Sequence, residues 1–254
     1  MYKTENVVYD KWLSDIIGNR SYTLKLDKEF ILRSKEDGTD ENHWVYSINN
    51  KDTEPLFIYT KVSTQAVEHI QFLTSIGFFL IDTNVTLKKK IDSQHNKNNK
   101  QGSQNIDIRF ANDRDRAGAV SVARNSFIYS RFHLDPWFSD NLANNIKAQW
   151  VSSYFDGIRG DQMVVALINN EIIGFLQILK PDENHFIIDL IGVDQEHQRK
   201  GIAKKMVNFA IQKNNGINKV LVGTQIGNIP SIKLYQKLGF FLENAKYVFH
   251  FYNK

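Results

Sequence analysis

The stretch over residues 189–210, DLIGVDQEHQRKGIAKKMVNFA, constrains the fold of this chain more than any other segment. Its first five residues, 189–193, are mostly apolar and β-branched, which predicts a strand. A helix begins near Gly201, with an apolar stripe at helical spacing formed by Ile202, Met206, Phe209 and Ala210. The sequence therefore predicts a buried strand that leads through a short loop into an amphipathic helix.

The loop between that strand and that helix has the properties of an anion site. Its small residues let the backbone approach a ligand closely, and the first turn of the helix presents free N–H groups and a partial positive charge. Arg199, Lys200 and Lys204 add full positive charges. This combination predicts a site for a pyrophosphate.

The composition is that of a globular chain with a small basic excess. The 254 residues allow one large or two small domains. The net charge of +4 suits small anionic ligands. The sequence has no basic stripe interleaved with aromatic residues, so we expect no nucleic-acid partner. Cysteine is absent, which excludes disulfides, thiolate metal ligands and a cysteine nucleophile. The apolar runs are too short to span a bilayer and the N-terminus lacks a signal-peptide core, so we expect a cytoplasmic protein with no membrane partner.

A polar, basic segment over residues 88–105 divides the chain. It is nearly free of large apolar residues, which is typical of a linker or an exposed loop. We therefore expect an N-terminal region over residues 1–90, a linker over 91–104 and a C-terminal domain over 105–254.

Beyond the linker, the hydrophobic pattern alternates regularly between strand and helix periods. We expect strands at 106–110, 163–168, 171–179, 186–193 and 219–223, helices at 114–127, 140–154, 202–213 and 229–238, and a final hairpin over 240–252. Asn169-Asn170 and residues 181–184 have the composition of the turns between the three central strands. The resulting order is β-αα-βββ-α-β-α-ββ.

This order, together with the spacing Gln-x-x-Gly-x-Ala from Gln198 to Ala203, resembles the GNAT acyltransferase superfamily. The resemblance implies an α/β fold with a mixed sheet, with the GNAT fold in the C-terminal domain. It also implies an acyl-CoA co-substrate, either acetyl-CoA or hydroxybutanoyl-CoA, and no metal. The residues that it assigns to acyl-CoA binding are Ile191, Gly192, Val193, Gln198, Arg199, Lys200, Gly201, Ile202, Ala203, Lys204, Asn228 and Ser231.

A second motif, TQIGNIPSIKLYQKLGF over residues 224–240, predicts a helix with Asn228 as its N-cap and Pro230 in its first turn. In GNAT enzymes the tyrosine of such a motif faces the thioester sulfur, and that role maps onto Tyr235. A phenol has a pKa of ~10 and is protonated at neutral pH, so a positioned phenol can donate its proton as the sulfur leaves, although the parent thiol, with a pKa of ~8.5, is the stronger acid. Packing beside the neighbouring leucines is the alternative for Tyr235.

The sequence assigns no general base. Asp189 lies on the strand that would flank the thioester, and Glu183, His185 and His197 are more distant candidates. Each has a structural or solvated role as its alternative, and a water relay is equally compatible with the sequence. For the oxyanion, the resemblance implies a backbone N–H donor within residues 191–193.

The N-terminal region carries a partial copy of the second motif. Residues 76–80, IGFFL, resemble residues 238–242, LGFFL, and helix-like segments precede both. The copy has Leu73 where the other has Tyr235, and it lacks the Gln-x-x-Gly-x-Ala loop. We interpret it as a smaller, structural, partial GNAT-like α/β region that extends the sheet or walls the acceptor pocket.

The segment between the two predicted helices carries the clue to the acceptor. SRF at residues 130–132, DPWF at 135–138 and AQW at 148–150 resemble the dTDP-fucosamine N-acetyltransferases, over about residues 105–252. The resemblance implies a nucleotide-linked amino-dideoxysugar as the acceptor, with Arg131, Trp137 and Phe138 as substrate residues. Arg131 would bind the diphosphate and Trp137 would stack on the base or sugar. Trp150 lies on an apolar stripe and is expected to be a core aromatic.

The expected function is therefore N-acylation of a nucleotide-linked amino sugar, such as dTDP-Fuc4N or dTDP-Fuc3N, by direct amine attack on acyl-CoA. Such an enzyme would serve the biosynthesis of lipopolysaccharide or another surface glycan. One alternative keeps this chemistry and changes the acceptor to a polyamine, an antibiotic or a protein N-terminus. Another is a non-catalytic acyl-CoA-binding module. A homodimer is left open.

Overall fold

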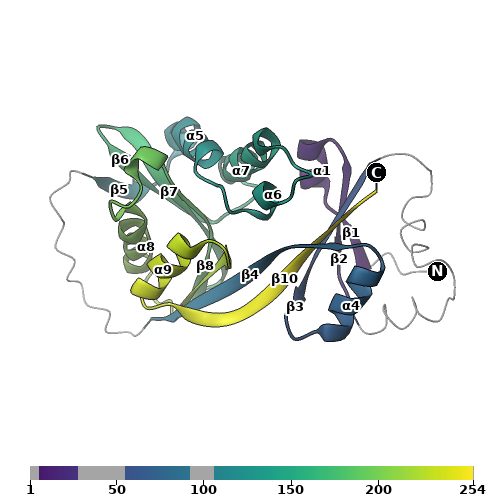
Figure 1. Cartoon of the computed structure of the whole chain (residues 1–254). Helices are drawn as coiled ribbons and strands as arrows, with labels where there is room; N and C mark the ends of the chain where they lie inside the picture. The colour runs from purple at the N-terminus through teal and green to yellow at the C-terminus, as the bar shows by residue number, and fades with distance from the viewer. Residues whose placement is uncertain (1–5, 28–54, 92–105, 254) are drawn as a thin grey trace. The chain divides into compact units, whose positions relative to one another are not determined.

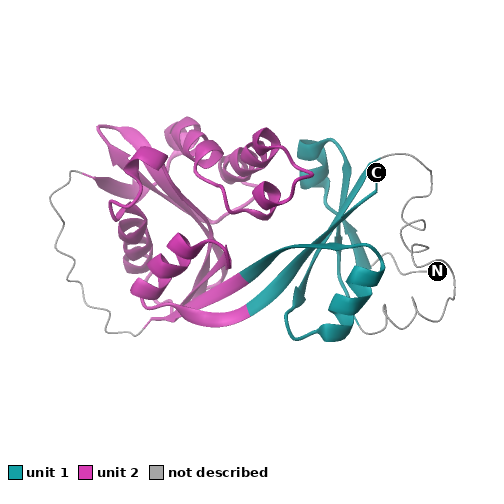
Figure 2. Cartoon of the chain, viewed as in Figure 1, with its two compact units in different colours: residues 1–84, 245–254 teal, residues 85–244 magenta. Residues whose placement is uncertain are grey.

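The computed structural model describes residues 6–27, 55–91 and 106–253. Apart from Ile91, the linker expected over 91–104 lies outside these residues. The chain forms two compact units, which Figure 2 distinguishes by colour: unit 1 comprises residues 1–84 and 245–254, and unit 2 comprises residues 85–244. These limits differ from the expected division at the linker, because the last ten residues belong to unit 1.

Unit 2 holds most of the regular elements of the chain (Figure 1). Its elements are β5 (Asp107–Phe110), α5 (Arg116–Asn125), α6 (Arg131–Leu134), α7 (Asp140–Phe155), β6 (Gln162–Ile168), β7 (Glu171–Asp182), β8 (His185–Val193), α8 (Ile202–Lys213), β9 (Lys219–Gln225) and α9 (Ile229–Lys237), with short 3-10 turns at Asp113–Asp115 and Gln195–His197. The helices and strands expected between 106 and 238 are thus confirmed, with shifts of a few residues at their ends. The strands lie in the order β9-β8-β7-β6-β5.

Helices cover both faces of the unit 2 sheet. Phe175 on β7 belongs to a core cluster that also contains Ala119 and Ala123 of α5 and Val151 of α7. The preceding residue, Gly174, faces α8 instead, since a Cβ built there would lie 3.1 Å from the Met206 side chain. Because successive residues of a strand point to opposite faces, α5 and α7 pack on one face and α8 on the other.

The two turns between the central strands follow local rules. Asn169 and Asn170 have φ values of 49° and 66°, so they form the tight two-residue turn that the sequence predicted. The turn expected over 181–184 is shorter than predicted, because Asp182 still pairs with His185 across the hairpin. The Asp182 carboxylate accepts the backbone N–H of His185 at 3.0 Å, which closes the turn inside the expected span.

The prediction of a hairpin over residues 240–252 is wrong. These residues form one strand, β10 (Phe241–Tyr252), which pairs antiparallel with β3 (Leu56–Ser63) over residues 246–252. The segment FLENAKYVFHFY has no glycine and no residue with positive φ that would reverse the chain. The pairing partner lies almost 200 residues away in sequence, so local pattern could not reveal it.

Unit 1 is a smaller α/β unit. Its elements are β1 (Val7–Tyr9), α1 (Lys11–Ile17), β2 (Arg20–Leu24), β3, α4 (Val67–Ser75) and the first half of β4 (Phe79–Lys90), with the second half of β10. The strand order is β1-β2-β3-β10-β4, so β10 lies between two strands that α4 connects. In the same way β4 lies between β9 and β10, the two strands that α9 connects.

The two strand–helix–strand segments have the same local geometry where the sequence predicted a partial repeat. The glycines that follow the two helices, Gly77 and Gly239, have φ values of 85° and 84°. The phenylalanine after each glycine donates its backbone N–H over 2.9 Å, to the carbonyl of Leu73 in one segment and of Tyr235 in the other. Both acceptor residues are buried. The repeat thus places an aliphatic side chain in unit 1 where unit 2 has a phenol.

Candidate active site

A gap in strand pairing defines the centre of unit 2. The parallel register between β8 and β9 runs from His185↔Lys219 to Ile188↔Val222 and ends there. At the same point the antiparallel register between β7 and β8 shifts, from Gln177↔Leu190 to Ile178↔Ile188, which leaves Asp189 as an extra residue. Such a bulge bends a strand and increases its twist. Residues 189–193 therefore run beyond the part of β8 that is paired with β9, and we call this interruption of the pairing the opening between the two strands.

Backbone donors line the β8 side of this opening. Asp194 donates its N–H to the carbonyl of Ile173 on β7 at 2.9 Å. Since N–H groups alternate between the two edges of a strand, those of Ile191 and Val193 point to the opposite edge, toward β9. Gly192 between them is buried, and a Cβ there would lie 2.7 Å from the Phe175 ring. The sequence thus aims two N–H groups into the opening and tolerates no side chain between them.

The predicted pyrophosphate loop follows directly and has the expected geometry. Gly201 stands at the N-cap of α8 with a left-handed φ of 79°, and no side chain caps that helix end. A Cβ at this glycine would meet no atom within 4 Å, so space adjoins the free N–H groups. Arg199 also has a positive φ, 62°, which is rare for a residue with a side chain.

The other predicted loop residues lie around this helix end and differ in burial, hydrogen bonding and charge. Ile202 is buried under the helix and Ala203 is half-buried. The Gln198 side chain donates to the Val193 carbonyl at 3.1 Å, which ties the loop to the end of β8. The remaining predicted residues, all exposed and cationic, are Arg199, Lys200 and Lys204. The structure therefore brings the predicted loop residues together at one helix terminus.

Helix α9 begins as the sequence predicted and carries the candidate phenol. Asn228 is its N-cap, and its side chain accepts the backbone N–H of Ser231 at 3.2 Å. Tyr235 is 1% exposed, and its ring lies 5.3 Å from that of Phe240. Burial raises the pKa of Tyr235 far above its ordinary value of 10.0, so the phenol stays protonated at physiological pH.

Asp189 is the candidate base nearest the opening, and its carboxylate accepts four hydrogen bonds. It accepts the Trp150 Nε1–H at 2.8 Å, two N–H groups of Arg159 at 2.8 and 2.6 Å, and the Gln177 amide at 3.2 Å. Three of these donors reach Oδ2 and one, from Arg159, reaches Oδ1. The Asp189 carboxylate is therefore held by several partners, and Trp150 is a hydrogen-bond donor as well as a packing aromatic.

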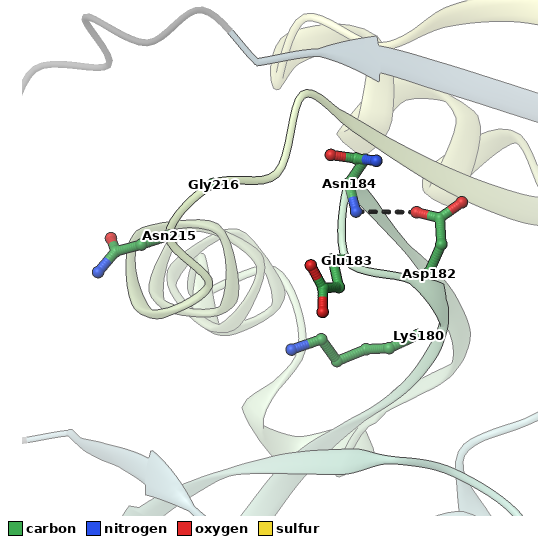
Figure 3. A pocket seen from close by; sticks show the side chains of 6 residues that line it. All are labelled: Lys180, Asp182, Glu183, Asn184, Asn215 and Gly216. Atoms are coloured by element: carbon green, nitrogen blue, oxygen red, sulfur yellow. Dashed lines mark hydrogen bonds between the residues drawn. The ribbon is translucent and has the colours of Figure 1, made fainter.

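The remaining candidate bases are His197, His185 and Glu183. His197 pairs with Asp194, and His185 pairs with Asp182 at 2.7 Å. His185 is the first residue of β8, at its other end, and Glu183 lines a hollow of about 680 Å³ (Figure 3). The residues around that hollow are Lys180, Asp182, Glu183, Asn184, Asn215 and Gly216. The hollow is thus separated from the opening by the length of β8.

The predicted acceptor residues lie on α6 and the turn after it. Arg131 is half-buried, with its guanidinium 4.4 Å above the centre of the Phe132 ring. Trp137 is half-buried, and its backbone N–H donates to the Asp135 carboxylate at 2.9 Å. Phe138 is only 5% exposed, so it packs beneath the turn and does not form part of its surface. Its contact with substrate stays a prediction.

A hydrogen-bond chain that the sequence did not reveal fixes α6 on α7. Ser130 Oγ lies 2.6 Å from His133 Nδ1, and His133 Nε2 lies 2.9 Å from the Asn144 amide oxygen. Because the amide oxygen only accepts, the Nε2 carries the proton and Nδ1 accepts from Ser130. Burial lowers the pKa of His133, which favours this neutral form. The three-residue spacing of Ser130 and His133 was the only sequence signal.

Unit 2 is an α/β unit with helices on both faces of its sheet, and residues 128–240 match the acetyltransferase (GNAT) family. Among solved structures, a GCN5-related N-acetyltransferase from Sphaerobacter thermophilus has a TM-score of 0.64 at 11% identity, covering 97% of this chain and 75% of that one. A tandem GNAT protein from the clavulanic acid biosynthesis pathway has a TM-score of 0.61 at 11% identity, covering 92% and 76%.

Three sequence relatives match parts of the chain. The spore coat polysaccharide biosynthesis protein SpsD of Bacillus subtilis is 34% identical over 138 residues, which are 54% of this chain and 47% of the relative. The mycothiol acetyltransferase of Corynebacterium glutamicum is 23% identical over 115 residues, 44% of this chain and 37% of that protein. A streptothricin acetyltransferase from Escherichia coli is 32% identical over 81 residues, 30% and 45%. The chain thus matches less than half the length of each relative.

The described residues also give two results on metals and membranes. Within them, no three His, Asp or Glu side chains are grouped in a way that could hold a metal ion. No helix in the same ranges is long and apolar enough to cross a bilayer.

Proposed function

We propose that this chain catalyses transfer of an acyl group from acyl-CoA to an amine. The observation that carries the proposal is the opening beside residues 189–193, with the free N-terminus of α8 next to it. The helix end and Arg199 would bind the pyrophosphate, and the N–H groups of Ile191 and Val193 would bind the thioester carbonyl oxygen. The donor is acetyl-CoA or hydroxybutanoyl-CoA.

The proposed reaction is a direct displacement at the thioester. The amine nitrogen forms a bond to the carbonyl carbon, the carbon–sulfur bond breaks, and the sulfur takes a proton from Tyr235. The proton lost by the amine passes to water, because the carboxylate nearest the opening already accepts four hydrogen bonds, and Tyr235 regains its proton from water. Since the Tyr235 side chain is 1% exposed, this role requires its hydroxyl to reach the sulfur from the floor of the opening.

For the acceptor we propose a nucleotide-linked amino-dideoxysugar, such as dTDP-Fuc4N or dTDP-Fuc3N, used in the cytoplasm for surface-glycan biosynthesis. The half-buried Arg131 and Trp137 support an anionic acceptor with a flat base. The similarity to the spore coat polysaccharide biosynthesis protein SpsD supports a polysaccharide pathway. The mycothiol and streptothricin relatives favour the alternative, an acetyltransferase for another amine.

The test measures thiol release with acetyl-CoA and hydroxybutanoyl-CoA against a panel of acceptors. The panel contains dTDP- and GDP-linked amino sugars, the same sugars without the nucleotide, a polyamine and an aminoglycoside. Arg131→Ala should raise KM for the nucleotide sugar and leave acyl-CoA affinity unchanged, because a diphosphate offers a guanidinium paired, charge-assisted hydrogen bonds. Arg124→Ala, an exposed arginine on α5, is the matched control.

Two results would contradict this acceptor. Equal turnover of free and nucleotide-linked sugars would support the acyltransferase activity and contradict the proposal that the acceptor carries a nucleotide. CoA binding without thiol release toward any amine would favour the non-catalytic module.

We further propose that the N-terminal region is a structural, partial copy of the GNAT C-terminal half. Its support is the shared strand–helix–strand geometry, with Leu73 buried in the place of Tyr235.

A further inference from the structure

We propose that Asp189 is a positioning residue, whose carboxylate holds the bulge of β8 in the shape that opens the site. Asp189 is the extra residue of the bulge, and the backbone beyond the β9 pairing, with the N–H groups of Ile191 and Val193, follows it directly. The inference rests on the proposed function for its kinetic test, but it concerns the backbone and has a readout of its own.

The carboxylate joins the bulge to three separate elements. Trp150 reaches it from α7, Arg159 from the loop between α7 and β6, and Gln177 from β7. The Arg159 guanidinium also lies 4.5 Å from the centre of the Trp150 ring. These contacts hold the side chain of the bulged residue from three separate elements.

The energetics of the cluster favour a role in geometry over a role in stability. The Asp189 side chain is 7% exposed, and a buried carboxylate loses hydration that its partners only partly restore. Gln177 is fully buried, and its Oε1 has no partner among the described residues. An orphaned buried acceptor destabilises a fold. An apolar cluster of similar volume would stabilise the fold at least as well. The polar cluster is therefore better explained by the backbone geometry that it maintains.

A second ion pair in unit 2 offers a matched control. Arg109 binds Asp115 with two hydrogen bonds of 2.6 and 2.8 Å, and the side chains are 35% and 6% exposed. The Arg159–Asp189 pair has hydrogen bonds of 2.8 and 2.6 Å and exposures of 41% and 7%. The control pair lies at β5, three strands away from β8 in the sheet. The two pairs thus match in burial and geometry and differ in place.

The experiment compares Asp189→Asn with Asp115→Asn in the full chain. Trp150→Phe is added because it removes one donor and keeps a ring, in case Asp189→Asn does not fold. A displacement of about 1 Å in a catalytic group can reduce a rate by about 10²-fold, so Asp189→Asn should lower kcat on that scale and change KM for acyl-CoA by less than about threefold. Trp150→Phe should lower kcat by about tenfold on the same reasoning. Asp115→Asn should keep kcat.

Two measurements separate this inference from other roles. Amide hydrogen exchange over residues 189–193 should accelerate in Asp189→Asn and Trp150→Phe, and not in Asp115→Asn, whether or not an acceptor is known. Unchanged exchange and unchanged kcat in Asp189→Asn would overturn the inference. Loss of the acidic limb of the pH–rate profile in Asp189→Asn alone would also overturn it, since that result identifies a general base. A wild-type chain that releases no thiol would contradict the proposed function and leave the exchange test intact.

Discussion

At the scale of single residues, the proposed chemistry depends on one buried phenol. Burial keeps Tyr235 protonated, so it can serve as a donor and not as a base. Tyr235→Phe should lower kcat by about 10²–10⁴-fold with little effect on KM for acyl-CoA, because a proton donor acts mainly in the transition state. Steady-state kinetics check this, with the unfolding midpoint as the control for packing. Turnover close to wild type would assign Tyr235 to the core.

A second residue-scale prediction concerns Gly201. A Cβ at this position meets no atom, but the left-handed φ disfavours any side chain, and a carboxylate would also repel a pyrophosphate. Gly201→Glu should therefore abolish CoA binding in calorimetry, and Gly201→Ala should weaken it without a charge effect. Gly216→Glu, at a glycine of similar φ with open space around it, controls for backbone strain. Equal CoA affinity in both glutamate variants would contradict the loop assignment.

At the scale of elements, the chain from Ser130 through His133 to Asn144 makes the docking of α6 on α7 sensitive to pH. The folded pKa of His133 is lower than its ordinary value of 6.5, so the unfolded chain binds a proton more readily than the folded one. The stability that neutral His133 supports is present above pH 6.5 and is lost as pH falls toward the folded pKa. The free energy of unfolding of wild type relative to His133→Gln should shrink below pH 6.5 in urea titrations. A difference that stays constant from pH 8 to about pH 5 would contradict this.

The elements also show what sequence can and cannot predict. Helix α8 was predicted at its observed limits, because its apolar stripe and the glycine before it are local signals. The final hairpin was wrong, because β10 finds its partners in β3 and β4, far away in sequence. The Asp189 cluster and the burial of Phe138 depend on tertiary packing, which no spacing in the sequence encodes. Helix caps and turns could therefore be predicted from the sequence, and long-range strand pairing could not.

At the scale of the whole molecule, strands β4 and β10 each contribute to both units. The fragment 105–254 would lack β4, which lies between β9 and β10, and both strands would then expose unpaired edges. We expect this fragment to be insoluble or to unfold without cooperativity, whereas the full chain unfolds in a cooperative transition. Circular dichroism during thermal unfolding, with CoA binding as a second readout, checks this. A fragment that folds and binds CoA would show that β4 is dispensable.

The place of β10 between β3 and β4 also has a consequence for synthesis. A ribosome makes β3, α4 and β4 early, but residues 245–252 emerge after all of unit 2. The sheet of unit 1 is therefore incomplete during most of translation, because β3 and β4 both lack their common partner, β10. Nascent chains stalled before residue 245 should recruit chaperones at exposed β3 and β4, and release of the last strand should end that contact.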